Sequence, residues 1–221
     1  MTTMDECPLV AHTAASAAAA EPLSCGATVL RRFARAEAPT LLADLEQSCR
    51  AAPFRHMETP GGFRMSVAMT NFGTLGWVSD RRGYRYASID PTSGRAWPPL
   101  PTSFIDLAGR AAAEAGYPQF RPDVCLVNCY VPGARLTPHQ DRNERDFSQP
   151  IVSVSLGLPA VFRFGGLKRA DSFMRVALEH GDVVVWGGAA RLCYHGVLAL
   201  KDGIHPLAGR RRINLTFRRA G

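Results

Sequence analysis

The stretch from Asn128 to Asp141, NCYVPGARLTPHQD, ends in the tripeptide His139-Gln140-Asp141. In an extended chain, side chains two residues apart point to the same side, so one imidazole and one carboxylate converge on a single point. With a second histidine they would form the ligand set of two histidines and one carboxylate that leaves open positions on non-haem Fe(II). Histidine and aspartate occur two apart often by chance, so the tripeptide alone is a weak signal.

A third ligand has to come from elsewhere in the chain, which has six histidines. A lone histidine on a strand more often serves the core or a sheet edge than a metal. His195, on the expected strand 192–197, is favoured only because His139 and Asp141 need a partner and because Arg212 and Arg218 follow it. The other four are His12 in the tail, His56 at the start of an aromatic-rich segment, and His180 and His205 in turns or loops.

The segment 212–218, RINLTFR, alternates polar and apolar side chains with a period of two. Its polar face carries Arg212, Asn214, Thr216 and Arg218. This face could lie in solvent, as is usual for an antiparallel strand. It could also line the inside of a barrel, where two arginines need a buried partner such as a dicarboxylate. A second strand, 124–130, carries Leu126, Asn128 and Tyr130 on one face.

The elements that must position these residues are mainly short strands. Gly, Pro and Asp turns separate them, which is typical of an all-β sandwich or barrel, and a double-sheet jelly roll is the natural closure. Helices are expected from Pro39 to near Pro53 and from Pro101 to Gly116, the second capped by Thr102 or Ser103. The expected strands are 25–32, 63–69, 84–88, 124–130, 151–158, 160–164, 174–178, 183–186, 192–197 and 212–218.

Residues 54–98 have a different character from the rest of the chain. They are rich in Gly, Pro, Met, Thr and aromatic residues, and no helical period is present. Trp77, Tyr84 and Tyr86 stand among Arg81, Arg82 and Arg85. Such interleaving can stack bases and hold phosphates, although packing of a small sheet would explain it equally well.

Composition bounds the remaining possibilities. The net charge of +7 is carried almost entirely by arginine, which permits a nucleic-acid partner but also fits an arginine-rich solvated surface. Six scattered cysteines without a C-x-x-C pair favour a reducing cytoplasm over a zinc cluster or a disulfide framework. No apolar run approaches the roughly 20 residues of a membrane helix. The alanine-rich residues 1–24 lack the basic residues of a signal peptide, so a disordered tail is expected.

Several segments together resemble the AlkB family of Fe(II)- and 2-oxoglutarate-dependent nucleic-acid dealkylases, and its bacterial members above all. The resemblance covers residues 54–220. The segments that carry it are 128–134, 139–141, 151–159, 164–169, 179–188 and 212–218, with 59–62 through Tyr84 and 89–91.

The resemblance implies an α+β fold with a double-stranded β-helix, or jelly-roll, core, flanking helices and a small β-rich nucleotide-recognition lid. The chain would then divide into the tail 1–24, a strand and helix at 25–53, the lid at 54–98 and the catalytic core at 99–221.

The resemblance also implies roles for the residues of the core. Fe(II) would be held by His139, Asp141 and His195, and O2 would be the second cosubstrate. Arg212 would pair with the C5 carboxylate of 2-oxoglutarate. Asn128 and Tyr130 would assist, and Arg218 and Asn214 would lie beside its other end. Leu126 belongs to the same cosubstrate-binding set.

In the lid, Trp77 would stack an extruded base against the His139 ring, while Tyr84 and Arg169 hold the phosphate backbone and the base. Thr59 and Met69 match further lid positions. Bacterial relatives carry an acidic residue two places after the metal-binding aspartate. Here that position is Asn143, so the choice among cationic lesions is left open.

The expected function is repair of alkylated DNA by oxidative demethylation of N1-methyladenine and N3-methylcytosine, releasing formaldehyde, succinate and CO2. The expected partners are single- or double-stranded DNA and no membrane, with the protein acting as a monomer. RNA could be the target instead, or the same site could hydroxylate a small molecule or a protein side chain. A non-catalytic nucleic-acid-binding module is disfavoured because the set of three metal ligands is complete.

Overall fold

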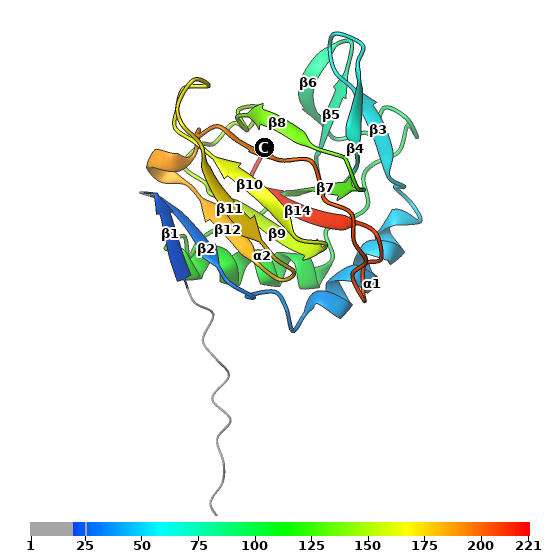
Figure 1. The fold of residues 1–221 in the computed structure, drawn as a ribbon. Helices are drawn as coiled ribbons and strands as arrows, with labels where there is room; N and C mark the ends of the chain where they lie inside the picture. Colours follow the sequence, from blue (N-terminus) through cyan, green and yellow to red (C-terminus); the bar gives the residue numbers. More distant parts are fainter. Residues whose placement is uncertain (1–19, 25) are drawn as a thin grey trace, which may run out of the picture.

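The computed structural model describes residues 20–24 and 26–221, which form two antiparallel sheets, a separate hairpin and two α-helices (Figure 1). The large sheet has eight strands, in the order β1 (Ala20–Ser24), β2 (Ala27–Leu30), β12 (Val183–Trp186), β9 (Ile151–Gly157), β14 (Arg212–Arg218), β7 (Val124–Tyr130), β4 (Arg64–Gly73) and β3 (Arg55–Glu58). The small sheet has the order β11 (Met174–Leu178), β10 (Ala160–Phe164), β13 (His195–Val197) and β8 (Leu136–His139). Strands β5 (Gly76–Asp80) and β6 (Gly83–Ala87) pair only with each other.

The molecule has three layers, with the helices α1 (Ala38–Cys49) and α2 (Thr102–Glu114) beneath the large sheet and the small sheet above it (Figure 1). One hydrophobic core lies between the helices and the large sheet, where Leu45 and Phe104 pack with Phe217 of β14. A second lies between the two sheets and includes Phe162 and Trp186. This face-to-face arrangement of two sheets is the expected jelly roll.

The two faces of strand β14 lie in different parts of the molecule. Ile213, Leu215 and Phe217 join the core under the large sheet. The alternate residues Arg212, Asn214, Thr216 and Arg218 are also buried, but they line the pocket between the sheets. The polar face of this segment therefore lies inside the molecule, and the solvent-facing alternative is wrong.

Most expected elements are confirmed, but the expected strand 192–197 begins only at His195, two other expectations are corrected, and strands of the expected lid are shared with the core. Residues 20–24, assigned to the tail, form strand β1 paired with β2, while residues 1–19 and 25 lie outside the described residues. Neither Thr102 nor Ser103 caps α2 through its side chain; Pro101 is the N-cap residue, and the Ser103 hydroxyl donates to Asp44 on α1. Strands β3 and β4 of the expected lid belong to the large sheet, because β4 pairs with β7.

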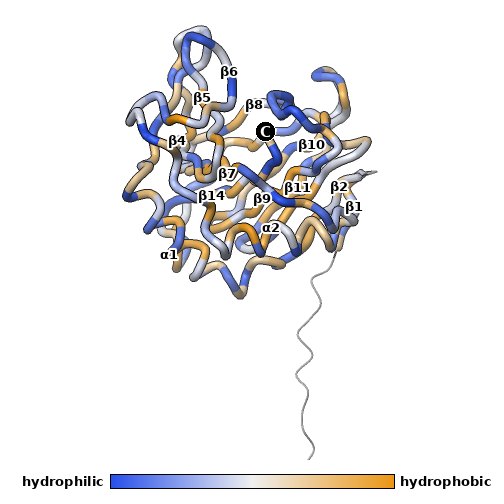
Figure 2. Tube along the Cα trace, turned by 180° about the vertical axis from the view of Figure 1, so that it is seen from behind, coloured by the Kyte–Doolittle hydropathy of each residue, from blue (hydrophilic) through white to orange (hydrophobic). Residues whose placement is uncertain are grey.

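The hairpin β5–β6 stands at one end of the molecule (Figure 2). Its turn is hydrophilic, in contrast to the more hydrophobic strands of the interior. The four cysteines among the described residues, Cys49, Cys125, Cys129 and Cys193, are free thiols. Neither helix of the described chain has both the length and the hydrophobicity needed to cross a membrane.

Candidate active site

A pocket of about 870 Å³ lies between the two sheets and under the β5–β6 hairpin. Its volume lies in the range of sites that bind small molecules and cofactors. Every residue that the sequence assigned to a site lines it. They are Thr59, Met69, Trp77, Tyr84, Leu126, Asn128, Tyr130, His139, Asp141, Asn143, Arg169, His195, Arg212, Asn214 and Arg218.

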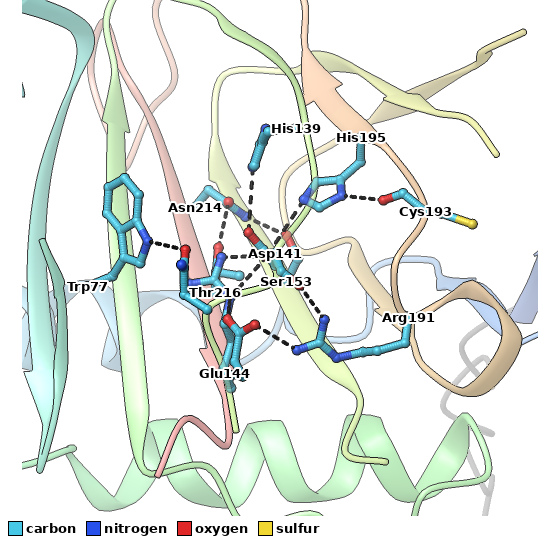
Figure 3. A network of polar contacts seen from close by, with 12 residues as sticks. Trp77, His139, Asp141, Glu144, Ser153, Arg191, Cys193, His195, Asn214 and Thr216 are labelled. Atoms are coloured by element: carbon cyan, nitrogen blue, oxygen red, sulfur yellow. Dashed lines mark hydrogen bonds and ion pairs between the residues drawn. The ribbon is translucent and has the colours of Figure 1, made fainter. Parts of the chain in front are cut away.

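His139, Asp141 and His195 converge in the pocket, each with a ligand atom within 4.8 Å of the others. The Nε2 atoms of His139 and His195 lie 3.6 and 3.7 Å from the two carboxylate oxygens of Asp141 (Figure 3). Strand pairing produces this arrangement, because His139 on β8 stands directly opposite His195 on β13. Strand β8 ends at His139, and Asp141 reaches the same point from just beyond it.

Both imidazoles are oriented for metal binding. Nδ1 of His139 lies 2.9 Å from the carbonyl oxygen of Thr137, and Nδ1 of His195 lies 3.0 Å from that of Cys193. A carbonyl can only accept, so each Nδ1 donates to it, which leaves each Nε2 as the nitrogen available to a metal at the centre. Burial and the neighbouring His195 lower the pKa of His139 to about 4, which keeps it neutral at physiological pH.

The third ligand is held as a carboxylate. Arg218 donates to Oδ2 of Asp141 from Nε at 3.0 Å and from a terminal nitrogen at 2.6 Å. Burial acts to raise the pKa of Asp141, but the Arg218 guanidinium outweighs it and holds that pKa well below its usual range. Two neutral imidazoles and one carboxylate on one side of a centre are the donor set of non-haem Fe(II) oxygenases, so these residues fit Fe(II).

The floor of the pocket presents buried polar atoms, most of them donors, that have no hydrogen-bond partner among the described residues. Arg212 is fully buried, and among the described residues its Nε and one terminal nitrogen have no hydrogen-bond partner. One terminal nitrogen of Arg218 and the amide oxygen of Asn128 are also unpaired. A buried cation without an acid is costly, and a ligand with carboxylates would satisfy it. The residues therefore fit 2-oxoglutarate, whose two carboxylates match the two arginines.

Tyr130 stands opposite Arg212 in the β7–β14 pairing, and the guanidinium lies 5.1 Å from the centre of its ring. Burial raises the pKa of the Tyr130 hydroxyl, so the group stays protonated beside the arginine. Asn214 uses its amide internally: it donates to Ser153 and to the Val154 carbonyl and accepts from Thr216. Asn214 thus ties β14 to β9 through the contact with Ser153 that Figure 3 shows.

The upper wall of the pocket comes from the hairpin. The indole of Trp77 stacks on the ring of Tyr84, with centroids 5.6 Å apart and planes 14° from parallel. Its Nε1 lies 3.5 Å from Oδ1 of Asn143, a long contact. Because Tyr84 covers one face of the indole, an incoming base would have to stack on the other.

Three further residues were missed as site residues. Glu144 is buried and accepts from the Tyr86 hydroxyl at 2.6 Å, and its other oxygen lies 3.1 Å from Arg191. Arg191 also donates to the Asp141 carbonyl. The sequence offered only a weak signal for these residues. Glu144 lies between Arg142 and Arg145, and its partner Tyr86 lies far upstream in the chain.

Comparison with known proteins gives a consistent result. A family model described as the 2OG-Fe(II) oxygenase superfamily matches residues 26–218. The chain is 59% identical to the α-ketoglutarate-dependent dioxygenase AlkB of Escherichia coli (strain K12), over 91% of this chain and 93% of that protein. It is 48% identical to an AlkB homologue of Caulobacter vibrioides (strain NA1000 / CB15N), over 84% of this chain and 81% of that protein. The solved structure of OsALKBH1 superposes with a TM-score of 0.79 at 28% identity, covering 91% of this chain and all of that one.

Proposed function

Because the chain belongs to the AlkB family of the 2OG-Fe(II) oxygenase superfamily and is a dioxygenase dependent on α-ketoglutarate (2-oxoglutarate), we propose that it repairs methylated bases in DNA by oxidative demethylation. The observation that carries the proposal is one pocket with three features. It holds a complete set of metal ligands, two arginines for a dicarboxylate and an aromatic wall suited to a base.

When bound, Fe(II), O2 and 2-oxoglutarate supply an oxidant that hydroxylates an N-methyl group, one oxygen atom ending in succinate and the other in formaldehyde. The protein's own residues position the reactants. His139, Asp141 and His195 would hold the metal. Arg212 would anchor one carboxylate of the cosubstrate, and Arg218 keeps Asp141 ionised and fixed in orientation.

The substrate base has to leave its helix to enter this pocket. The methyl group of N1-methyladenine or N3-methylcytosine lies on the pairing edge, which is hidden in a duplex. Unstacking costs a few kcal/mol and least for a base that cannot pair, so part of the selectivity needs no specific contact. We infer that the free face of Trp77 receives the base, opposite His139, while Arg169 and Tyr84 contact the strand.

Human ALKBH1, 32% identical over 56% of this chain, is described as a nucleic acid dioxygenase, which does not distinguish DNA from RNA. DNA is the favoured substrate here because two relatives from Arabidopsis thaliana, 32% and 41% identical to the matched parts of this chain, are described as DNA demethylases. RNA is the alternative. The free thiols of the described chain support a reducing cytoplasm as its location. We expect a monomer, since one chain supplies every residue of the site.

The test is an anaerobic titration with Fe(II) and 2-oxoglutarate, followed by oxygen and a methylated single strand, with formaldehyde measured. Methylated DNA, methylated RNA and free small substrates are compared in parallel. We expect formaldehyde from the methylated strand and none with His139→Ala. Unchanged demethylation by that variant would overturn the catalytic assignment, and turnover only of free substrates would favour a small-molecule hydroxylase.

A further inference from the structure

The arginines of this chain differ in whether an acidic side chain neutralises them. Arg55, Arg85, Arg110 and Arg210 each pair with a carboxylate within 4.0 Å. A second group has no ion pair within the described residues, although acidic residues are present in the chain. Part of this group lies at or beside the pocket: Arg64, Arg135, Arg142 and Arg169 line it, and Arg163 and Arg175 lie on the adjoining small sheet.

Arg163 and Arg175 stand directly opposite each other in the β10–β11 pairing. Their neighbours Phe162, Phe164 and Val176 are buried between the sheets, so both arginines project from the outer face. Side chains paired in this way start about 5 Å apart, and like charges at such positions destabilise the pair. No carboxylate of residues 20–24 or 26–221 forms an ion pair with either. An anion bound between them would remove the repulsion.

The geometry around Arg163 holds its guanidinium in place. Its central carbon lies 4.2 Å from the ring centre of Phe173. That ring occupies the space above Gly165, where a Cβ would approach it to 2.9 Å. On the other side, Arg163 pairs with Gly196 of β13, which is buried under the backbone of Leu136. Phe173 therefore pre-positions the Arg163 cation, while Arg175 opposite it is exposed.

The hairpin that joins β10 to β11 connects Arg163 and Arg175 to the pocket along the chain. The hairpin between β10 and β11 carries the exposed Lys168 and Arg169, and Arg169 lines the pocket itself. Asp171 in the same hairpin accepts from the backbone N–H of Lys168. Figure 1 shows this hairpin at the same end of the molecule as the β5–β6 hairpin, with β8 between them.

We propose that Arg163 and Arg175, reached from the pocket over Lys168 and Arg169, form a second phosphate-binding surface for the nucleic-acid strand whose base occupies the pocket. The partner chemistry is a polyanionic sugar-phosphate backbone, which guanidinium groups bind through charge-assisted forks. This inference rests on the proposed function, because that function places one base of the strand in the pocket. It extends the contact beyond the base to nucleotides on one flank.

The experiment measures binding of an unmethylated single strand of about 12 nucleotides, within the footprint of single-strand-binding proteins, as a function of salt concentration. The test variant is Arg163→Gln/Arg175→Gln. The control is Arg50→Gln/Arg110→Gln, which removes the same charge from the helices beneath the large sheet. Loss of two phosphate contacts should reduce the slope of log K against log salt by about 1.4, at about 0.7 for each contact. The control should leave that slope close to the wild-type value.

A trinucleotide is too short to reach the outer face, so its binding should change no more in the test variant than in the control. Arg163→Lys/Arg175→Lys should keep the wild-type slope, which separates loss of charge from misfolding. An unchanged slope in the glutamine variant would overturn the proposal. An effect seen only with duplex DNA would also overturn it, because the complementary strand would then contact Arg163 and Arg175. Binding is measured without oxygen, so no turnover is needed. A failed demethylation assay and a failed binding test can therefore be told apart.

Discussion

The hydroxyl of Tyr86 on β6 donates a 2.6 Å hydrogen bond to Glu144, 58 residues further along the chain. Glu144 is buried and its carboxylate also lies 3.4 Å from Nε of Arg218, the residue that holds the metal ligand Asp141. The hairpin that covers the pocket and Asp141, the carboxylate proposed to bind the metal, therefore belong to one polar network. The position of the hairpin is tied to the site chemically as well as by packing.

Tyr86→Phe should loosen the hairpin without changing the metal ligands. A hydrogen bond to a charged group contributes about 1.5–3 kcal/mol, so we expect the free energy of unfolding to fall by roughly that amount. The KM for a methylated oligonucleotide should rise while succinate formation without substrate stays near the wild-type rate. Tyr84→Phe is the matched control for stability, because its ring still stacks on Trp77. Equal stability of the two variants would show that the Tyr86 hydroxyl does not hold the hairpin.

The sequence predicted what depends on local pattern. The period of two in 212–218 gave both the bounds of β14 and the shared face of Arg212 and Arg218. It could not say whether that face was inside or outside, because this depends on which strands lie above it. His139 and Asp141 were found from their spacing, although the strand ends at His139, two residues before Asp141.

The parts that the sequence missed depend on contacts between distant segments. Strand β1 has no alternation of its own and is ordered by pairing with β2. Strand β4 joins the large sheet through β7, which lies more than 50 residues away in the chain. Helix α2 was expected to be capped from within, but Ser103 instead donates to Asp44 on α1. Helix packing therefore competed with local capping at this terminus.

Arg212→Met should separate stability from cosubstrate binding. Arg212 is buried without an acidic partner among the described residues, and it donates to the Ser155 hydroxyl at 2.9 Å. Replacing buried charges with apolar side chains is often neutral or stabilising by about 1–4 kcal/mol, so the protein without ligand should be as stable as wild type or more so. With Fe(II) under nitrogen, 2-oxoglutarate at about 100 times its Kd should stabilise the wild type by about 2.7 kcal/mol. The variant should lose this increment; a retained increment would place the cosubstrate elsewhere.

Trp77→Ala should impair repair while sparing the oxidation of 2-oxoglutarate. Stacking of a base on an aromatic ring is worth about 1–3 kcal/mol, so the KM for a methylated strand should rise by roughly 5- to 140-fold. Trp77→Phe, which keeps a ring opposite Tyr84, should recover part of this. Formaldehyde and succinate are measured together. A parallel loss of both products would mean that Trp77 serves the fold of the hairpin and does not bind the base.

Asn143→Asp should favour cationic lesions over neutral ones. Asn143 lines the pocket beside Trp77, where a carboxylate would attract a positively charged base. At an effective dielectric constant near 20, two unit charges 4 Å apart interact by about 4 kcal/mol, so even partial screening leaves a measurable preference. We expect the ratio of kcat/KM for N1-methyladenine to that for a neutral methylated base to rise several-fold. An unchanged ratio would show that residue 143 does not contact the base.

His180 and His205 form a pair away from the pocket, with ring centres 4.3 Å apart. Nδ1 of His180 accepts from the backbone N–H of Gly157 at 3.0 Å, so the ring is neutral, with its proton on Nε2. Burial, His205 and Arg35 lower the pKa of His180 below its ordinary value of 6.5, and burial and Arg35 do the same for His205. The folded protein thus resists protonation of both rings.

This sets the sign of a pH dependence. Between the lowered folded pKa and the unfolded value of about 6.5, the unfolded chain binds more protons, so stability falls as the pH drops through that window. His180→Asn keeps an acceptor for Gly157 but does not titrate. Urea unfolding between about pH 7.5 and about pH 5 should show a smaller loss of stability in the variant than in wild type. Arg35→Gln should also flatten the curve by removing the nearby cation. Parallel curves for all three proteins would show that the histidine pair does not control stability in this range.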